Sequence, residues 1–217
     1  EKVEIELAAL PPVGMHLLQL QNPNGLFSND FIFHVAKNAE AAAELTRQTD
    51  RAHRDIREVL AEAIANGDLE HVKRILNRAG RRINERQPAS GSTALSTAAF
   101  HDRIDIANLL IRRGAKVETT NRDGNTPLLV AAFMCRRKMV QLLLEKGASP
   151  LTKNGRGETS IDVVSSPWTK QLADIYTGID NVVPEFKFNL ERIERERPQM
   201  ADLLRNHVEQ AKTEKEE

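Results

Sequence analysis

The sequence predicts an all-α solenoid of stacked helix–turn–helix repeats with hairpin fingers, preceded by a small antiparallel β segment. One observation is a triplet, Thr126-Pro127-Leu128, that has counterparts 33 residues away on either side, at 93–95 and 159–161. A fixed period of about 20 to 50 residues is typical of repeat architectures. Aromatic residues make up only 4% of the chain, which favours helices packed on helices. In residues 3–35, by contrast, apolar positions alternate with period two, which indicates strands.

Composition excludes several classes of function. Charged residues make up 29% and balance to a formal net charge of zero, so the overall charge gives no support to binding nucleic acid or an anionic membrane. No apolar run approaches the roughly 20 residues of a membrane span. Cys135 is the only cysteine, which rules out an intrachain disulfide. The chain begins at Glu1 without a signal peptide, so we expect it to be a fragment of a longer protein.

Residues 1–35 are expected to form strands near 3–7, 16–20 and 31–35, separated by turns at Pro11-Pro12 and at 22–25. The stretch "GMHLLQLQNPNGLFSNDFIFHV" resembles the closing strands of a TIG-type immunoglobulin-like domain. That resemblance implies a partial immunoglobulin-like β segment. It also favours a bacterial, extracytoplasmic setting over a cytoplasmic one.

Residues 36–66 contain neither Gly nor Pro, and their apolar residues recur at spacings of three, four and seven. This pattern predicts one helix that ends at Gly67, with 36–54 as a helical linker. After it, "ALSTAAFHDRIDIANLLIRRGA" and "PLLVAAFMCRRKMVQLLLEKGA" each predict a short helix, a tight turn and a second helix. The looser "SIDVVSSPWTKQLADIYTG" follows the same plan. Segments around Gly124 and Gly157 predict the hairpin fingers.

These segments resemble the ankyrin repeat family, whose motif is roughly "D..G.TPLH.AA..G....V..LL..GA". The matching residues are Gly124, Thr126, Pro127, Leu128, Ala131, Ala132, Val140, Leu142, Leu143, Gly147 and Ala148. The resemblance covers about residues 55–205, with four repeats to residue 176 and a capping unit whose last helix starts at Pro198. Residues 206–217 are expected to be a charged, frayed tail. Ser165, Ser166 and Pro167 depart from the motif, and Trp168 with Tyr176 is expected to fill the resulting gap.

The sequence supports no catalytic site. Gly155-Arg156-Gly157 lacks the strand and the Lys-Ser or Lys-Thr pair of a phosphate loop, and the histidines lack metal-ligand spacing. Cys135 precedes three basic residues that could lower its thiol pKa, although a small turn residue is the simpler interpretation. We therefore expect no enzyme, no cofactor and no metal. A hydrolase assembled from distant residues stays open as a third hypothesis.

The ankyrin resemblance implies that a protein or peptide partner binds on the concave surface formed by the fingers and the inner helices. The expected partner-binding residues are Ser90, Ser92, Phe100, His101, Arg122, Asp123, Asn125, Phe133, Met134, Arg156 and Glu158. Phe100 and Phe133 occupy the same position one repeat apart, so they should project side by side as a binding hot spot. The alternative is that both tuck against residues 1–54 of the same chain.

Two other hypotheses concern the partner and the role of the array. The repeat region is locally basic, so it could grip an acidic partner, although a solvated face is the simpler interpretation. Nucleic acid is not expected, because no aromatic residues interleave with the bases. We expect a monomer without membrane insertion. The competing function is a structural envelope protein in which the repeats clasp or space the N-terminal β domain.

Overall fold

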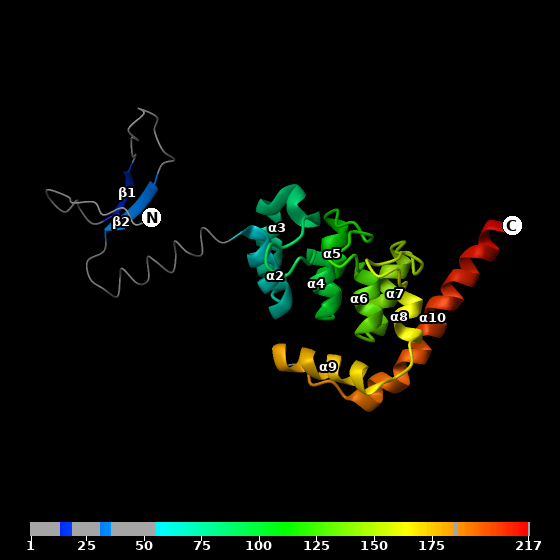
Figure 1. The fold of residues 1–217 in the computed structure, drawn as a ribbon. Helices are drawn as coiled ribbons and strands as arrows, with labels where there is room; N and C mark the ends of the chain where they lie inside the picture. The colour runs from blue at the N-terminus through cyan, green and yellow to red at the C-terminus, as the bar shows by residue number, and fades with distance from the viewer. Residues whose placement is uncertain (1–13, 19–30, 36–54, 185, 217) are drawn as a thin grey trace. The chain divides into compact units, whose positions relative to one another are not determined.

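The computed structural model describes residues 14–18, 31–35, 55–184 and 186–216 (Figure 1). Contacts divide the chain into two parts, Glu1–Arg54 and Asp55–Glu217. In the first part, β1 (Gly14–Leu18) pairs antiparallel with β2 (Phe31–Val35), and Gly14 lies opposite Val35. The predicted strand at 3–7 and the linker at 36–54 lie outside the described residues. The immunoglobulin-like resemblance and the extracytoplasmic setting that depends on it stay predictions.

The second part opens with the helix pair α2 (Ile56–Asn66) and α3 (Leu69–Ala79), followed by the 3₁₀ turn η1 (Gly80–Asn84). The prediction of one uninterrupted helix over 36–66 was wrong at Asp55, and residues 36–54 lie outside the described residues. Asp55 has a non-helical ψ of 129°, and its carboxylate accepts a hydrogen bond from the Arg57 backbone N–H at 2.8 Å. It is therefore an N-cap, and α2 begins after it. The helix ends where expected, at Gly67, whose φ of 74° suits glycine.

The 33-residue period corresponds to three helix starts of the same kind. Helices α4 (Ala94–Phe100), α6 (Pro127–Phe133) and α8 (Ser160–Ser165) each follow a threonine N-cap. The hydroxyls of Thr93, Thr126 and Thr159 accept hydrogen bonds from backbone N–H groups three residues on, at 3.1, 3.1 and 3.2 Å. Each cap satisfies a donor that the first turn would otherwise leave unpaired. The prediction that the three triplets begin equivalent helices is confirmed.

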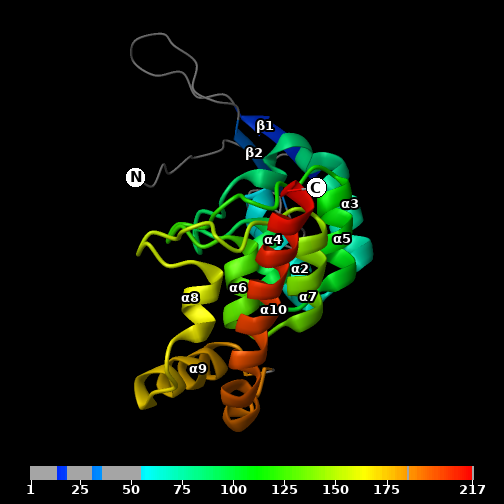
Figure 2. The same ribbon diagram turned by 90° about the vertical axis from the view of Figure 1, so that its right-hand side faces the viewer.

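These helices stack in two layers (Figures 1 and 2). The inner layer is α2, α4, α6 and α8 in order, and the outer layer includes α3, α5 (Ile104–Arg112) and α7 (Arg137–Glu145). Small alanines let the inner helices approach closely, while leucines fill the space between the layers. Fully buried examples are Ala98, Ala131, Leu110, Leu128 and Leu143. Each repeat shelters its apolar face against the next, as expected of a solenoid.

The fourth repeat departs from the plan. Helix α8 packs on α10 (Leu190–Glu216), so the predicted second helix, α9 (Lys170–Val182), does not occupy the outer position. In the second and third repeats the turn between helices is made by Asp102 and Cys135, whose φ angles are 55° and 52°. At the end of α8, Ser166 is extended, with ψ 139°, because it precedes Pro167. The chain therefore leaves α8 without reversing, and α9 runs back beneath the ends of α4 and α6 (Figure 1).

Helix α10 differs from the expectation in two ways. Pro198 lies inside the helix instead of at its start, so the two predicted helices of the capping unit are one. The helix also continues through residues 206–216, so no element ends at the expected boundary before the tail. The apolar side of α10 includes Ile193, Met200 and Leu204, which are buried. No helix in the described residues is long and apolar enough to cross a membrane.

Candidate functional site: a groove on the concave face

Asparagine side chains close the turn of the second and of the third finger. The Asn121 side-chain oxygen accepts from the backbone N–H groups of Asp123 and Asn125 at 3.0 and 2.9 Å. Asn154, one repeat later, accepts from two N–H groups of its own finger at 2.9 Å each. Short polar side chains close turns in this way because they mimic a backbone acceptor. The fingers are also joined to each other, since the Gly155 N–H donates to the Asp123 carbonyl at 2.9 Å.

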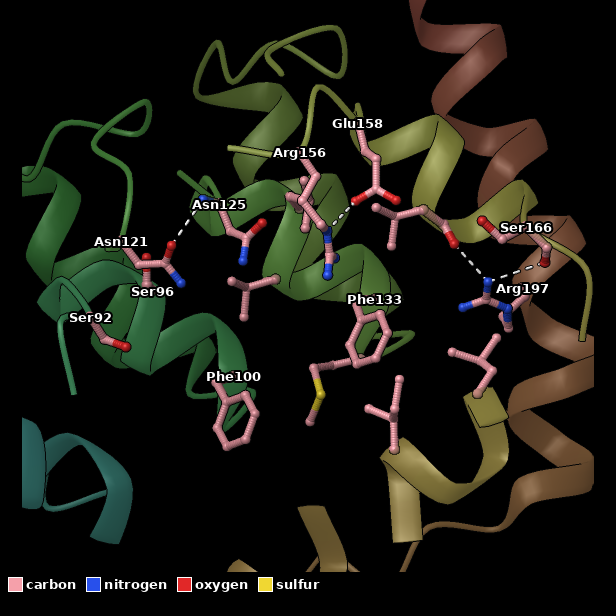
Figure 3. A pocket seen from close by; sticks show the side chains of 16 residues that line it. Ser92, Ser96, Phe100, Asn121, Asn125, Phe133, Arg156, Glu158, Ser166 and Arg197 are labelled. Carbon is pink, nitrogen blue, oxygen red and sulfur yellow. Dashed lines mark hydrogen bonds and ion pairs between the residues drawn. The ribbon is translucent and has the colours of Figure 1, made fainter. Parts of the chain in front are cut away.

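A groove of about 380 Å³ lies between the fingers, the inner helices and α9. In Figure 3 Arg156 and Glu158 reach into it from the finger side, and Phe100 and Phe133 border the opposite side. The lining residues are Ser92, Ser96, Phe100, Asn121, Asn125, Leu129, Val130, Phe133, Met134, Arg156, Glu158, Val163, Ser166, Leu172, Ile175 and Arg197. This is an apolar floor with a polar rim, and its volume falls in the range of about 300–1,000 Å³ that is usual for ligand sites.

One side of the groove is closed by a segment that we call the strap, namely α9 together with residues 186–188. Figure 2 shows α9 on the same side of the stack as the fingers. Tyr176 of α9 stacks on Phe133, with ring centroids 4.8 Å apart and an angle of 8° between the planes. Phe186 packs on Phe100 at 5.1 Å. The aromatic side chains of the strap therefore cover the ends of α4 and α6.

The strap is tied down at Tyr176, which is fully buried. Its hydroxyl donates a hydrogen bond to the Phe133 carbonyl at 2.5 Å and accepts one from the Arg197 guanidinium at 3.3 Å. Burial raises the pKa of Tyr176 to about 12. Arg197 is only 2% exposed and also donates to the Val163 and Ser166 carbonyls, at 2.6 and 3.3 Å. Arg197 thus connects the carbonyl end of α8 to the strap. A cation is favoured at that end of a helix.

A second cation packs on the strap from the third repeat. The Arg136 guanidinium lies over the rings of Phe186 and Phe188, 5.1 and 5.9 Å from their centroids. Burial lowers its pKa, and its Nε has no hydrogen-bond partner in the described part of the chain. The aromatic faces compensate a partly desolvated charge in such a geometry. Burial also raises the pKa of the nearby Asp102 carboxyl, against the attraction of Arg136.

The structure brings seven of the eleven predicted partner-binding residues into the groove lining. They are Ser92, Phe100, Asn125, Phe133, Met134, Arg156 and Glu158. The others lie elsewhere. Arg122 and Asp123 line a neighbouring hollow at the finger tips. Ser90 donates to the Gln87 side chain at 2.7 Å, and His101 packs on Phe100 and Phe186.

Two expectations about these residues were wrong. Phe100 and Phe133 do not project as a pair of free aromatic rings, because Phe186 and Tyr176 pack on them and leave both half-buried. Met134 was expected on the surface but is 0% exposed. The covering segment is the strap. Residues 1–54 were the alternative cover, and their placement against the repeats lies outside what the structure describes.

Sequence reasoning missed the groove residues that follow the third finger. Leu172, Ile175 and Arg197 complete the wall, yet they belong to α9 and α10, whose paths the repeat motif does not specify. The available signal was Pro167, which prevents the tight turn of the earlier repeats. Ile175 on α9 is 47% exposed, although it is apolar. Only the position of α9 beside the groove identifies it as a lining residue.

Cys135 is buried in the array, and burial raises its thiol pKa to about 11. This contradicts the alternative of a thiol pKa lowered by its basic neighbours, and the simpler interpretation of Cys135 as a small turn residue agrees with its φ of 52°. We expect the folded chain at pH 8 to react with a disulfide reagent roughly a hundredfold more slowly than the urea-unfolded chain, since the thiolate is the nucleophile. The raised pKa also makes folding stability fall as the pH rises from about 9 towards 11, because the unfolded thiol ionises first. Equal labelling rates for folded and unfolded chains would contradict the burial.

Comparison with known proteins supports the repeat assignment. Residues 60–154 match the family model for ankyrin repeats, in three copies. No curated protein matches the chain. The match runs from within α2 to the third finger and ends before α8, so the strap and α10 lie beyond it. Ankyrin repeats generally mediate protein–protein interaction, and proteins built from them are typically non-catalytic.

Proposed function

We propose that the chain is a non-catalytic binding module whose concave groove takes a segment of a partner protein. One observation carries the proposal. The groove is lined by the fingers and inner helices of the repeats on one side and by α9 on the other. Its floor is apolar, and the side chains around that floor form hydrogen bonds. Apolar side chains surrounded by such a rim are the usual composition of a protein-binding hot spot.

The rigidity of the site favours binding. The rim residues are already fixed, because Asn154 donates to the Asn125 side chain at 3.0 Å and Arg156 donates to Glu158 at 2.8 Å. Hydrogen bonds from Asn154 and Arg156 hold the pKa of Glu158 below its ordinary value, so it stays ionised. A rim that is already ordered loses little conformational entropy on association.

A matched pair of substitutions on α9 tests the proposal. Ile175 faces the groove, while Val182 is 81% exposed and does not line it. Peptides would first be selected against the whole chain from a random twelve-residue phage library and then synthesised with a fluorescent label. We expect Ile175→Asp to weaken their binding about tenfold or more, because a buried apolar contact contributes roughly 1.5–3 kcal/mol.

Val182→Asp places the same charge on the same helix and should leave peptide affinity unchanged. Both positions are exposed enough that neither variant should alter the circular dichroism spectrum. Peptides that bind both variants as well as the parent chain would place the binding site outside the groove and refute the proposal. Failure to select any peptide would count against it in the same way.

A further inference from the structure

Each of the three fingers carries one exposed arginine: Arg86, Arg122 and Arg156. All three line a hollow of about 470 Å³ at the finger tips. The hollow adjoins the groove, because Asn121, Asn125 and Arg156 line both. A row of cations, one per repeat, therefore borders the apolar groove.

Two of the three arginines are held by neutral partners on neighbouring fingers. Arg86 donates to the Thr120 carbonyl and hydroxyl at 2.9 and 3.0 Å. Arg122 donates to the Pro88 carbonyl at 3.0 Å. Neither has a carboxylate within ion-pair distance in the described part of the chain. Their side chains are thus fixed in place while their positive charges are left without an opposite charge.

The negative charges of this region do not balance the row. Glu158 pairs with Arg156 at 2.8 Å and accepts from Asn154 at 3.2 Å, so it is already engaged. Glu158 lines the groove, and Asp123 is the one carboxylate that lines the hollow, whose lining the structure describes completely. Arg197, at the far end of the groove, is bound by neutral oxygens only. The combined lining therefore holds four arginines and two carboxylates.

We propose that the partner is an extended acidic segment. Its carboxylate side chains face Arg86 and Arg122, and an apolar side chain next to them enters the groove. This inference rests on the proposed function, because it names the partner chemistry of the same groove. A planar guanidinium matches a carboxylate through paired hydrogen bonds. Single-stranded nucleic acid fits less well, since its bases stack on open aromatic faces, and Phe186 and Tyr176 of the strap already pack on the rings of Phe100 and Phe133.

The test uses the peptides selected on the whole chain. We expect their sequences to be enriched in Asp and Glu beside a large apolar residue. The double variant Arg86→Gln/Arg122→Gln should weaken their binding roughly three- to tenfold, because exposed ion pairs each contribute modestly. Raising the salt concentration from about 50 to 300 mM should narrow this difference, since salt screens exposed charges. The matched control is Arg112→Gln/Lys146→Gln, which removes two exposed positive charges from outer-helix ends and should change nothing.

A second variant guards against a structural effect, because Arg86 and Arg122 also tie the fingers together. Glu158→Gln keeps a hydrogen-bond acceptor but removes one negative charge, so it should strengthen binding of the acidic peptides about twofold. One outcome would overturn the acidic partner and leave the groove function supported. In it, Ile175→Asp weakens peptide binding, but the peptides are not enriched in Asp and Glu and neither charge variant changes their affinity. Peptides insensitive to Ile175→Asp would refute both. A labelled single-stranded DNA that binds as tightly as the peptides, with the same arginine dependence, would also overturn the inference.

Discussion

Replacing Tyr176 with alanine is expected to produce the largest loss of stability of any single substitution in the strap, roughly 3–5 kcal/mol. The ring is fully buried between Phe133, Trp168 and Phe188, with centroid distances of 4.8, 5.9 and 5.4 Å. Removing it leaves a cavity beneath α9 and also breaks the two hydrogen bonds of its hydroxyl. The melting temperature should fall by roughly 6–20 °C.

Two measurements separate release of the strap from global unfolding. Trp168 is the only tryptophan and stacks on Tyr176, so its emission should shift to the red when the strap detaches. The circular dichroism spectrum should still show the helices of the first three repeats, since a solenoid is stabilised by contacts between nearest neighbours.

Tyr176→Phe is the matched control. It keeps the ring and loses the hydroxyl, so it should cost only about 1–3 kcal/mol. Equal losses for the two variants would show that the stacked ring contributes little.

The substitution Gly124→Ala should cost roughly 2–4 kcal/mol, because it combines two penalties. Gly124 has a φ of 80°, a left-handed conformation that alanine adopts with strain. Its added methyl would also lie 2.5 Å from the Gly155 backbone nitrogen, so the neighbouring finger would have to move. That finger carries Arg156 and Glu158, which means that the rim of the groove would move with it.

Gly157 provides an unusually close control. It has the same φ of 80° one repeat later, but a methyl there meets nothing within 4 Å. Gly157→Ala should therefore cost only the backbone strain, about 1–2 kcal/mol. Urea denaturation of the two variants measures the difference, which reports the contact between fingers. If both variants lost the same stability, the close approach of the second and third fingers would not hold in solution.

Much of the repeat region could be predicted from the sequence. The threonine caps, the alanines of the inner helices and the glycines of the fingers are local signals. The caps and the finger glycines recur every 33 residues in three repeats, and the alanine pair at 98–99 recurs at 131–132. Residues that act through such local chemistry were placed correctly, including Thr126 and Gly67. The rim of the groove followed from the same period, because the finger tips stack in register.

The position of the strap could not be predicted in the same way. Trp168 and Tyr176 were expected to fill a gap near α8, and they do stack on each other, but Tyr176 reaches Phe133 in the previous repeat. The contact joins residues 43 positions apart, and no short-range pattern specifies it. Likewise, the charged sequence around Arg197 reads as a solvated helix face until α8 and α9 enclose it.

The sequence by itself determined the repeats, their period and the surface on which a partner is expected, because caps, turns and small-residue helices depend on neighbours along the chain. Only the tertiary structure decided how much of that surface is open. Pro167 prevents the usual reversal of the chain after α8. The aromatic residues Tyr176 and Phe186 therefore pack on the apolar ends of α6 and α4. The groove is what remains between that strap and the fingers.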